Sequence, residues 1–364
     1  MDSARVALAH DWLNGMRGGE KCLEVLCELY PQSTVFTLFC EPDKLSRTLA
    51  EHAIRTSRVQ RFPLARSHYR AYLPFFPAAV ETFDLDAFDL VVSTSHCVAK
   101  GAPKRRDAVH VCYCFTPMRY AWGFFNEYFG SRDPLTRWAL RRVLGRLRDW
   151  DLRANERVDR FIAISRHVRE RIRRHYGRDA DVIYPPVNTA FFTPDAGRER
   201  TPTYLLVSAL VPYKRVELAV EAFNRSGRPL TVIGDGPDRA ALEKKAAPNV
   251  RFFGWQSDET LRSHYRSARA LVFPGEEDFG IVPVEALACG LPVVAYGKGG
   301  ILETVEDGRT GVFFGEPTAE ALLGALDRFE ALRFRPEELT ARAARFGRDR
   351  FREEIRKALE DSLC

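Results

Sequence analysis

The stretch that decides the fold is Ala270–Gly300, which reads ALVFPGEEDFGIVPVEALACGLPVVAYGKGG. Its two apolar segments, Ala270–Phe273 and Leu291–Ala295, have the composition of buried strands. Between them, an acidic turn that contains glycine leads into a short helix predicted over residues 281–289, and Gly290 is a typical helix stop. This order of strand, turn, helix and strand predicts an α/β domain with a mainly parallel sheet.

The start of this helix is the first candidate binding site. Pro283 fits only in the first turn of a helix, where its missing N–H group costs nothing, so the helix must begin beside Phe279 and Gly280. The backbone N–H groups at this end, including that of Ile281, combine with the helix dipole to favour an anion. Because the turn follows the carboxyl end of a strand, a phosphate of a bound nucleotide is the expected anion.

Two glutamates flank the predicted anion site. Glu277 lies in the turn, and Glu285 lies about one helical turn after the start of the helix. A carboxylate in the position of Glu285 can accept hydrogen bonds from two neighbouring ribose hydroxyls, and one in the position of Glu277 can accept from a sugar hydroxyl. The spacing alone is also typical of an acidic loop and a helix-start glutamate in any α/β protein, so the surrounding residues must decide.

The longer pattern closely resembles the donor-site signature of the retaining glycosyltransferases of family 4, two glutamates separated by seven residues. It runs Glu-Asp-Phe-Gly, four residues, then Glu-Ala-Leu-Ala-Cys-Gly-Leu-Pro-Val-Val-Ala. Further segments resemble the same family in order and spacing: HDWLNGMRGGEK, STSHCVAKG, CYCFTPMRYAW, VSALVPYKR, GDGP, GWQSD and GGILETVEDGRTG. The sequence looks most like those members, mannosyltransferases, that build O-antigen and related surface polysaccharides.

The resemblance implies the GT-B architecture, in which two Rossmann-like domains with mainly parallel sheets face each other across a cleft. It also implies retaining transfer of a sugar, mannose from GDP-mannose, to a lipid-linked or oligosaccharide acceptor. No metal cofactor is expected, because in this family a basic pair and a helix N-terminus neutralise the leaving diphosphate. Lys214 matches the family lysine. The family arginine five positions earlier is replaced by Ala209, which leaves Arg215 as the candidate for the second charge.

Three glycines are further candidates for contact with the donor. Gly18 and Gly19 follow the first predicted strand and open a helix, so a ligand could approach the backbone closely there. A tight turn without a ligand is the alternative for this loop. Gly234 ends another predicted strand in the turn GDGP, outside the carboxyl edge of its sheet.

Two residues of the front half are candidates for contact with the sugar or the acceptor. His96 follows a predicted strand, and a purely structural histidine is the alternative. Arg119 lies in the segment CYCFTPMRYAW, where Phe115 occupies the position at which the family often carries a histidine. In the family that imidazole tends to lie near the transferred sugar. The replacement predicts either that the contact is dispensable or that another group reads the sugar hydroxyl.

The 364 residues are enough for two domains of ordinary size, each with its own core. We expect an N-terminal, acceptor-side domain over residues 1–190 and a linker over residues 191–203, which are polar and contain proline and glycine. A donor-binding domain is then expected over 204–344. The resemblance implies that a final helix, over 345–364, crosses back to the first domain.

The charge is uneven along the chain. Residues 1–190 contain 30 Lys+Arg and 22 Asp+Glu, a net of +8, and residues 191–364 contain 25 and 27, a net of −2. The front half should therefore attract anions, such as the headgroups of a membrane. A long basic helix predicted over 134–158 carries one apolar stripe. It can pack on its own sheet, lean on an anionic membrane, or do both.

Several classes of protein are disfavoured. No apolar run approaches the roughly twenty residues that span a bilayer, and no charged-then-apolar leader begins the chain, so a cytoplasmic protein, peripheral on the inner face of the plasma membrane, is expected. The eight cysteines have no zinc spacing and are expected to be reduced.

Two alternatives to a glycosyltransferase remain. One is a nucleotide-sugar epimerase or hydrolase of the same fold. The other is a non-enzymatic nucleic-acid-binding protein, for which no RNA or DNA module is evident.

Overall fold

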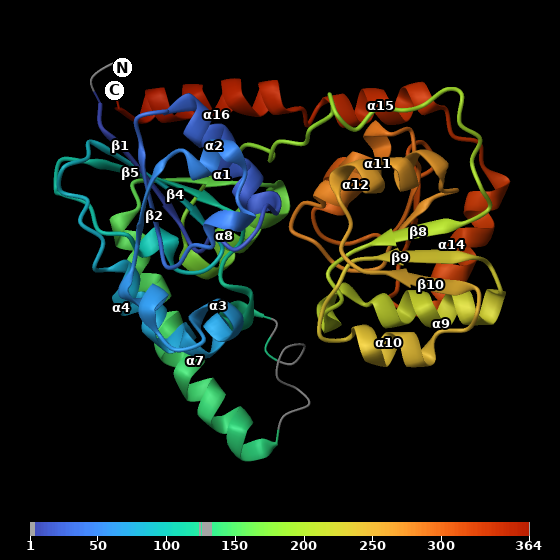
Figure 1. Ribbon diagram of the computed structural model, residues 1–364, viewed down its shortest axis with the longest axis horizontal. Helices are drawn as coiled ribbons and strands as arrows, with labels where there is room; N and C mark the ends of the chain where they lie inside the picture. Colours follow the sequence, from blue (N-terminus) through green and yellow to red (C-terminus); the bar gives the residue numbers. More distant parts are fainter. Residues whose placement is uncertain (1–3, 124, 126–132, 364) are drawn as a thin grey trace. The chain divides into compact units, whose positions relative to one another are not determined.

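The computed structural model describes residues 4–123, 125 and 133–363, and the chain divides into two compact units. The first unit runs to Pro186 and includes the chain from Asp349 onward, and the second runs from Val187 to Arg348. Each unit has one parallel sheet with helices packed on it (Figure 1). The predicted α/β class and the predicted parallel sheets are therefore confirmed.

The sheet of the first unit has seven parallel strands in the order β3-β2-β1-β4-β5-β6-β7. The strands are β1 (Val6–His10), β2 (Thr34–Thr37), β3 (Ala53–Thr56), β4 (Leu90–Ser95), β5 (Val109–Cys114), β6 (Arg160–Ala163) and β7 (Asp181–Val182). The α-helices are α1 (Gly18–Leu29), α2 (Arg47–Ala50), α3 (Ala65–His68), α4 (Phe76–Val80), α5 (Arg119–Trp122), α7 (Pro134–Ala154), α8 (Arg166–Tyr176) and α16 (Arg348–Leu363). Short 3-10 helices are η1 (Pro42–Lys44), η2 (Arg58–Arg61), η3 (Tyr69–Phe75), η4 (Ala99–Gly101) and η5 (Asn155–Arg157).

The sheet of the second unit has six parallel strands in the order β10-β9-β8-β11-β12-β13. The strands are β8 (Tyr204–Val207), β9 (Leu230–Ile233), β10 (Val250–Phe253), β11 (Leu271–Phe273), β12 (Val293–Tyr296) and β13 (Gly311–Phe314). The helices are α9 (Val216–Ser226), α10 (Arg239–Lys245), α11 (Asp258–Ser267), α12 (Ile281–Ala288), α13 (Ile301–Thr304), α14 (Ala319–Ala331), α15 (Pro336–Ala344) and the 3-10 helix η6 (Pro212–Lys214). In Figure 1, α9, α10 and α14 lie on one side of this sheet, and α11, α12 and α15 lie on the other.

The strand order creates one switch point in each sheet. In the first sheet, β1 pairs with β2 on one side and with β4 on the other, so the chain connections diverge between β1 and β4. In the second, β8 pairs in the same way with β9 and β11. Ligands of open α/β sheets bind outside the carboxyl ends of the strands at such a point. The switch points thus mark the ends of β1, β4, β8 and β11 for inspection.

Alternating strand residues of the second unit form its core with α9 and α14. Leu206, Val232, Val272 and Val294 point to one face of the sheet and pack against buried residues of α9 and α14, among them Phe223. These strands read as continuous apolar runs because helices cover both of their faces. Strands β8, β11 and β12 are buried along their whole length, so a polar ligand can reach them only at their ends.

The long basic helix α7 is buried only in its second half. Leu144, Leu147 and Trp150 are at most 8% exposed and belong to the core of the first unit. Leu135 and Trp138, near the start of the helix, are 75% and 55% exposed. The apolar stripe predicted from the sequence therefore packs on the helix's own domain, and the first turns of α7 extend away from it (Figure 1).

The last helix belongs to the first unit. Phe351, Ile355 and Leu359 on α16 are fully buried, and the ring of Phe351 lies 5.5 Å from that of Tyr113 on β5. The guanidinium of Arg160 donates to the carbonyl oxygen of Ala358 at 2.8 Å. The chain thus leaves the first unit near residue 186 and returns to it near residue 349.

The segment predicted as a linker, residues 191–203, packs on the second unit. The Arg200 guanidinium donates to the carbonyl oxygens of Ala268 and Gly290, at 2.8 and 2.5 Å. The N–H group of Thr201 donates to the carbonyl of Ser267 at 2.7 Å. Proline, glycine and charged residues are common in linkers, and here the arginine also satisfies carbonyl groups just after α11 and α12.

In the described part of the chain, no helix combines the length and the apolar character needed to cross a bilayer.

Candidate functional site

The carboxyl edge of the second sheet gathers most of the predicted donor-site residues. Lys214 lies in the loop that follows β8, and Glu277 lies in the turn that follows β11. These two strands are the neighbours at the switch point. The sequence separates the residues by 63 positions, and the sheet brings them into contact.

Lys214 and Glu277 form an ion pair through the lysine ammonium and the glutamate Oε1. Their side chains are only 17% and 12% exposed, so solvent screens this pair weakly. Gly275 allows the approach of the two loops, because a Cβ there would lie 3.0 Å from the Cα of Lys214. A side chain at this position would push the β8 loop and the β11 turn apart.

The acidic turn is held in place by the loop after β12. The N–H group of Gly300 donates to the carbonyl oxygen of Glu277 at 2.7 Å, and a β-bridge joins Glu277 to Gly299. A side chain at Gly300 would collide with the backbone of Asp278 and Phe279. The glycine-rich loop therefore fixes the turn.

Helix α12 begins beside Phe279 and Gly280, as predicted from the position of Pro283. Its N-cap is Gly280, in a left-handed conformation with φ 94°, and Pro283 is the third helical residue. No side chain of the N-cap closes the helix start. The predicted residues Phe279, Gly280 and Ile281 are thus grouped at a helix N-terminus that presents backbone N–H groups and a positive dipole end.

Glu285 is the fifth residue of α12 and is 5% exposed. The hydroxyl of Tyr265 on α11, which is fully buried, donates to Glu285 Oε2 at 3.2 Å. Burial and the neighbouring Glu285 raise the pKa of Tyr265 well above its usual value, so this hydroxyl stays a donor. The sequence indicated Tyr265 only as an apolar helix residue, since a partner on another helix leaves no local signal.

Arg215 and Gly234 are the other two predicted residues of this unit, and their contacts differ from those of Lys214 and Glu277. Arg215 has φ 52°, and its guanidinium lies 5.1 Å over the ring of Tyr296. Its Nη1 atom is buried without a hydrogen-bond partner among the described residues. Gly234, with φ 135°, packs against the backbone of Ser208. Lys214 and Arg215 are therefore adjacent in sequence but are held by different elements.

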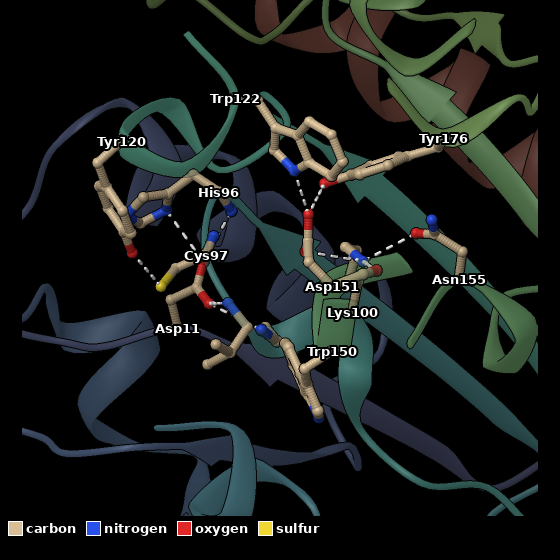
Figure 2. A network of polar contacts seen from close by, with 12 residues as sticks. Asp11, His96, Cys97, Lys100, Tyr120, Trp122, Trp150, Asp151, Asn155 and Tyr176 are labelled. Carbon is tan, nitrogen blue, oxygen red and sulfur yellow. Dashed lines mark hydrogen bonds and ion pairs between the residues drawn. The ribbon is translucent and has the colours of Figure 1, made fainter. Parts of the chain in front are cut away.

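A second polar cluster lies at the switch point of the first sheet. Asp11, directly after β1, is fully buried and accepts hydrogen bonds from the backbone N–H groups of residues 96–99 at 2.7–2.9 Å. Its Oδ2 atom also lies 3.0 Å from Nδ1 of His96. Although burial alone would raise it, the interactions with His96 lower the pKa of Asp11 to about 2. Figure 2 shows His96 and Asp11 side by side.

The remaining candidates of the front half also lie in this unit. Gly18 and Gly19 are the first two residues of α1, and a Cβ on Gly19 would lie 3.2 Å from the ring of Phe115. Phe115 in turn lies beside His96, with ring centroids 6.3 Å apart. Arg119 is the first residue of α5. The structure thus groups Gly19 and His96 around Phe115, and the roles of these residues in ligand binding stay predictions.

No group of three or more potential metal ligands is found where the chain is described. Seven cysteines, all except the terminal Cys364, are described there, and each is buried and free of a disulfide. These cysteines lie in the cores of the units.

Two family models together match residues 17–350. The model "Glycosyltransferase Family 4" matches residues 17–191, and the model "Glycosyl transferases group 1" matches residues 190–350. The chain belongs to glycosyltransferase family 4. The resemblance read from the sequence is therefore confirmed.

Curated relatives of this family member are glycosyltransferases. A GDP-mannose-dependent alpha-(1-6)-phosphatidylinositol monomannoside mannosyltransferase of Mycolicibacterium smegmatis is 31% identical over 231 residues, 55% of this chain and 58% of the relative. A D-inositol 3-phosphate glycosyltransferase of Streptomyces bingchenggensis is 32% identical over 189 residues, 43% of this chain and 41% of the relative. The chain spans about half the length of the curated relatives it matches.

Solved structures show the same fold along nearly the whole chain. A sucrose-phosphate synthase from Thermosynechococcus elongatus has a TM-score of 0.73 at 18% identity and covers 98% of both chains. A lipopolysaccharide outer core galactosyltransferase has a TM-score of 0.66 at 17% identity and covers 98% of this chain and 99% of its own. The fold is the α/β, GT-B fold with two Rossmann-like domains, as expected.

Proposed function

We propose that this protein is a retaining glycosyltransferase that moves mannose from GDP-mannose to a lipid-linked or oligosaccharide acceptor in cell-surface polysaccharide synthesis. The observation that carries the proposal is the convergence of Lys214, Glu277, Glu285 and the N-terminus of α12 at one switch point. A cation and a helix start suit a diphosphate, and two carboxylates suit hydroxyl groups on either side of it. Membership of the family and the GDP-mannose-dependent relative support the choice of donor.

The proposed chemistry uses these groups on the leaving diphosphate. The bond between the anomeric carbon and the phosphate oxygen breaks and the phosphate keeps the electron pair. The acceptor oxygen bonds to the same face of the sugar, and its hydroxyl proton passes to the leaving phosphate oxygen. Lys214 and the N–H groups of α12 stabilise the growing negative charge. Glu277, which pairs with Lys214, accepts a hydrogen bond from a hydroxyl of the bound sugar.

The positive charge of Lys214 and of the N-terminus of α12 comes from the protein itself, so we propose catalysis without a metal cofactor.

A nucleotide-sugar epimerase or hydrolase of the same fold is the second candidate, since it would use the same diphosphate site. Product analysis separates the two. The glycosyltransferase consumes GDP-mannose only in proportion to the acceptor glycosylated, whereas the alternative converts the nucleotide sugar with no acceptor present.

Glu285→Gln should weaken the binding of GDP. The variant replaces a charged acceptor of the ribose hydroxyls by a neutral one, and the lost interaction corresponds to roughly 1.5–3 kcal/mol, or about 10- to 150-fold in the dissociation constant. Isothermal titration calorimetry with GDP and UDP gives the affinities. Glu337→Gln, an exposed glutamate on α15, is the control and should leave them unchanged. Equal affinity of wild type and Glu285→Gln for the preferred nucleotide would contradict the ribose contact.

For a lipid-linked acceptor we propose docking on anionic lipid at the inner face of the plasma membrane. The first turns of α7 carry the exposed Leu135 and Trp138, and the guanidinium of Arg142 lies 4.5 Å over the Trp138 ring. Residues 134–148 contain five arginines and no acidic residue. A helix with exposed apolar side chains among arginines suits the boundary between lipid headgroups and acyl chains.

The protein should sediment with vesicles of phosphatidylglycerol and phosphatidylcholine, less so as salt rises, and far less with phosphatidylcholine alone. Replacing Leu135 and Trp138 together by serine should lower the partition coefficient by about tenfold, because apolar area no longer leaves water. Trp255→Ser is the matched control, since Trp255 is 79% exposed but lies in the second unit. Equal binding to charged and neutral vesicles would refute electrostatic docking.

A further inference from the structure

His96 is held by its neighbours in a way that leaves one ring nitrogen available. Its Nδ1 atom faces Asp11 Oδ2 at 3.0 Å, and 36% of its side chain is exposed. No described residue forms a hydrogen bond with Nε2. The imidazole lies at the carboxyl end of β4, which borders β1 at the switch point of the first sheet. A ligand in this place would meet Nε2.

Asp11 determines the chemical form of that imidazole. An ionised carboxylate has only acceptor atoms, and the four backbone N–H groups that it binds keep it ionised despite its burial. Nδ1 of His96 must therefore carry the proton that it shares with Asp11. In the neutral ring this leaves Nε2 as a hydrogen-bond acceptor with its lone pair toward solvent.

The segment that carries His96 is fixed at its other end by a second buried carboxylate. Lys100, 1% exposed, forms an ion pair with Asp151 of α7 at 2.9 Å and donates to Asn155 at 2.8 Å. Asp151 also accepts hydrogen bonds from Trp122 and Tyr176. Figure 2 shows both carboxylates, with the segment between them. The position of the imidazole is thus set before any ligand binds.

The surroundings of the His96 ring suit a sugar. The His96 ring meets Trp12 edge to face with centroids 4.5 Å apart, and Phe115 lies at 6.3 Å, both half-buried. Aromatic rings offer apolar faces for the C–H side of a pyranose, and one placed acceptor fixes its orientation. The other histidine nearby, His10, is 2% exposed and its Nδ1 is occupied by Thr94, so it offers no comparable acceptor.

We propose that Nε2 of His96 accepts a hydrogen bond from a sugar hydroxyl, and that Asp11 is the positioning residue that fixes the tautomer and orientation of His96 for this contact. The inference rests on the proposed function, because the hydroxyl belongs either to the transferred sugar or to the acceptor.

Two substitutions of His96 test separately its Nδ1 contact with Asp11 and its proposed Nε2 contact with a sugar hydroxyl. His96→Asn keeps an N–H group for Asp11 but has no atom in the place of Nε2, and His96→Gln keeps an acceptor near Nε2 but loses the contact with Asp11. We expect His96→Asn to lower kcat/KM about tenfold, the effect of losing one hydroxyl contact, and His96→Gln to retain part of the activity. An increase confined to the donor KM, or to the acceptor KM, identifies the sugar concerned. Full activity of His96→Asn would overturn the proposal.

The effect of Asp11 on the tautomer of His96 can be measured separately from any effect on the stability of the protein. In ¹⁵N NMR of histidine-labelled protein, the His96 signal, assigned by its loss in His96→Gln, should show a protonated Nδ1 and an unprotonated Nε2. Asp11→Asn should shift the population toward the opposite tautomer, because an amide can donate to Nδ1. Methyl α-mannoside or GDP-mannose should move the Nε2 signal, and GDP should not. A protonated Nε2 in the neutral wild-type ring, or no response to either sugar, would overturn the proposal.

Asp11→Asn also removes an acceptor from backbone groups, so its kinetic effect is compared in two backgrounds. If Asp11 acts through His96, Asp11→Asn should lower kcat/KM in the wild type and have little further effect in His96→Asn. Equal losses in both backgrounds would assign Asp11 a structural role only. Absence of GDP binding in the wild type would instead contradict the proposed function, so the two failures are distinguishable.

Discussion

Lys214→Ala should lower kcat by roughly a hundredfold or more, and saturating donor should not restore it. As the glycosidic bond breaks, negative charge grows on the leaving phosphate oxygen, so a cation placed there binds the transition state more tightly than the ground state. The expected magnitude follows from the loss of one donor to a developing oxyanion. Steady-state kinetics with GDP-mannose would measure the loss of kcat. The same assays in the presence of EDTA would test whether the reaction proceeds without a metal ion.

Arg215→Ala is the comparison variant, because it removes the next cation along the chain. Its guanidinium lies over Tyr296 and not beside Glu277, so we expect a smaller loss of kcat. The double variant should lose more than either single one, since both cations can act on the same diphosphate. An increase in the donor KM with kcat intact for Lys214→Ala would make Lys214 a binding residue. A requirement for magnesium or manganese after EDTA would refute the metal-free proposal.

Of the variants considered, Lys100→Met should lower the free energy of unfolding most. It leaves the fully buried Asp151 without its cation, and among the described residues Trp122 and Tyr176 still donate to this carboxylate at 2.6 and 2.9 Å. Breaking one partner of a buried pair costs about 3–5 kcal/mol. At about 2–4 °C per kcal/mol, the unfolding temperature of the first unit should fall by roughly 10 °C. Differential scanning calorimetry would measure the change.

Two further variants make this result specific. Lys100→Met combined with Asp151→Asn should recover much of the loss, since the amide oxygen still accepts from Trp122 or Tyr176 and no charge stays buried. Arg47→Met breaks the Arg47–Glu51 pair, whose arginine side chain is 91% exposed, and should leave the transition unchanged. An unchanged transition in Lys100→Met would mean that Asp151 does not depend on this cation.

The fold and the donor edge could be predicted from the sequence because their signals are local. Pro283 fixed the start of α12, and Gly290, with φ 70°, ended it. Glu277 and Glu285 were predicted as a donor-site pair from the longer pattern around them, since their spacing alone also fits an acidic loop and a helix-start glutamate. Over residues 191–203, where the signal depended on composition alone, the sequence predicted a linker but not the hydrogen bonds by which Arg200 attaches this segment to the second unit.

By itself, the sequence determined the α/β class and the family and predicted the residues of the donor edge, because helix starts, glycine turns and apolar strands are encoded within a few positions of one another. Only the tertiary structure decided which side chains meet across those positions. Asp11 lies 85 residues from His96 and Tyr265 lies 20 from Glu285, and neither pair leaves a periodic or local signal. The contacts arise because parallel strands deliver their carboxyl ends to one edge of a sheet, where residues from separate loops face each other.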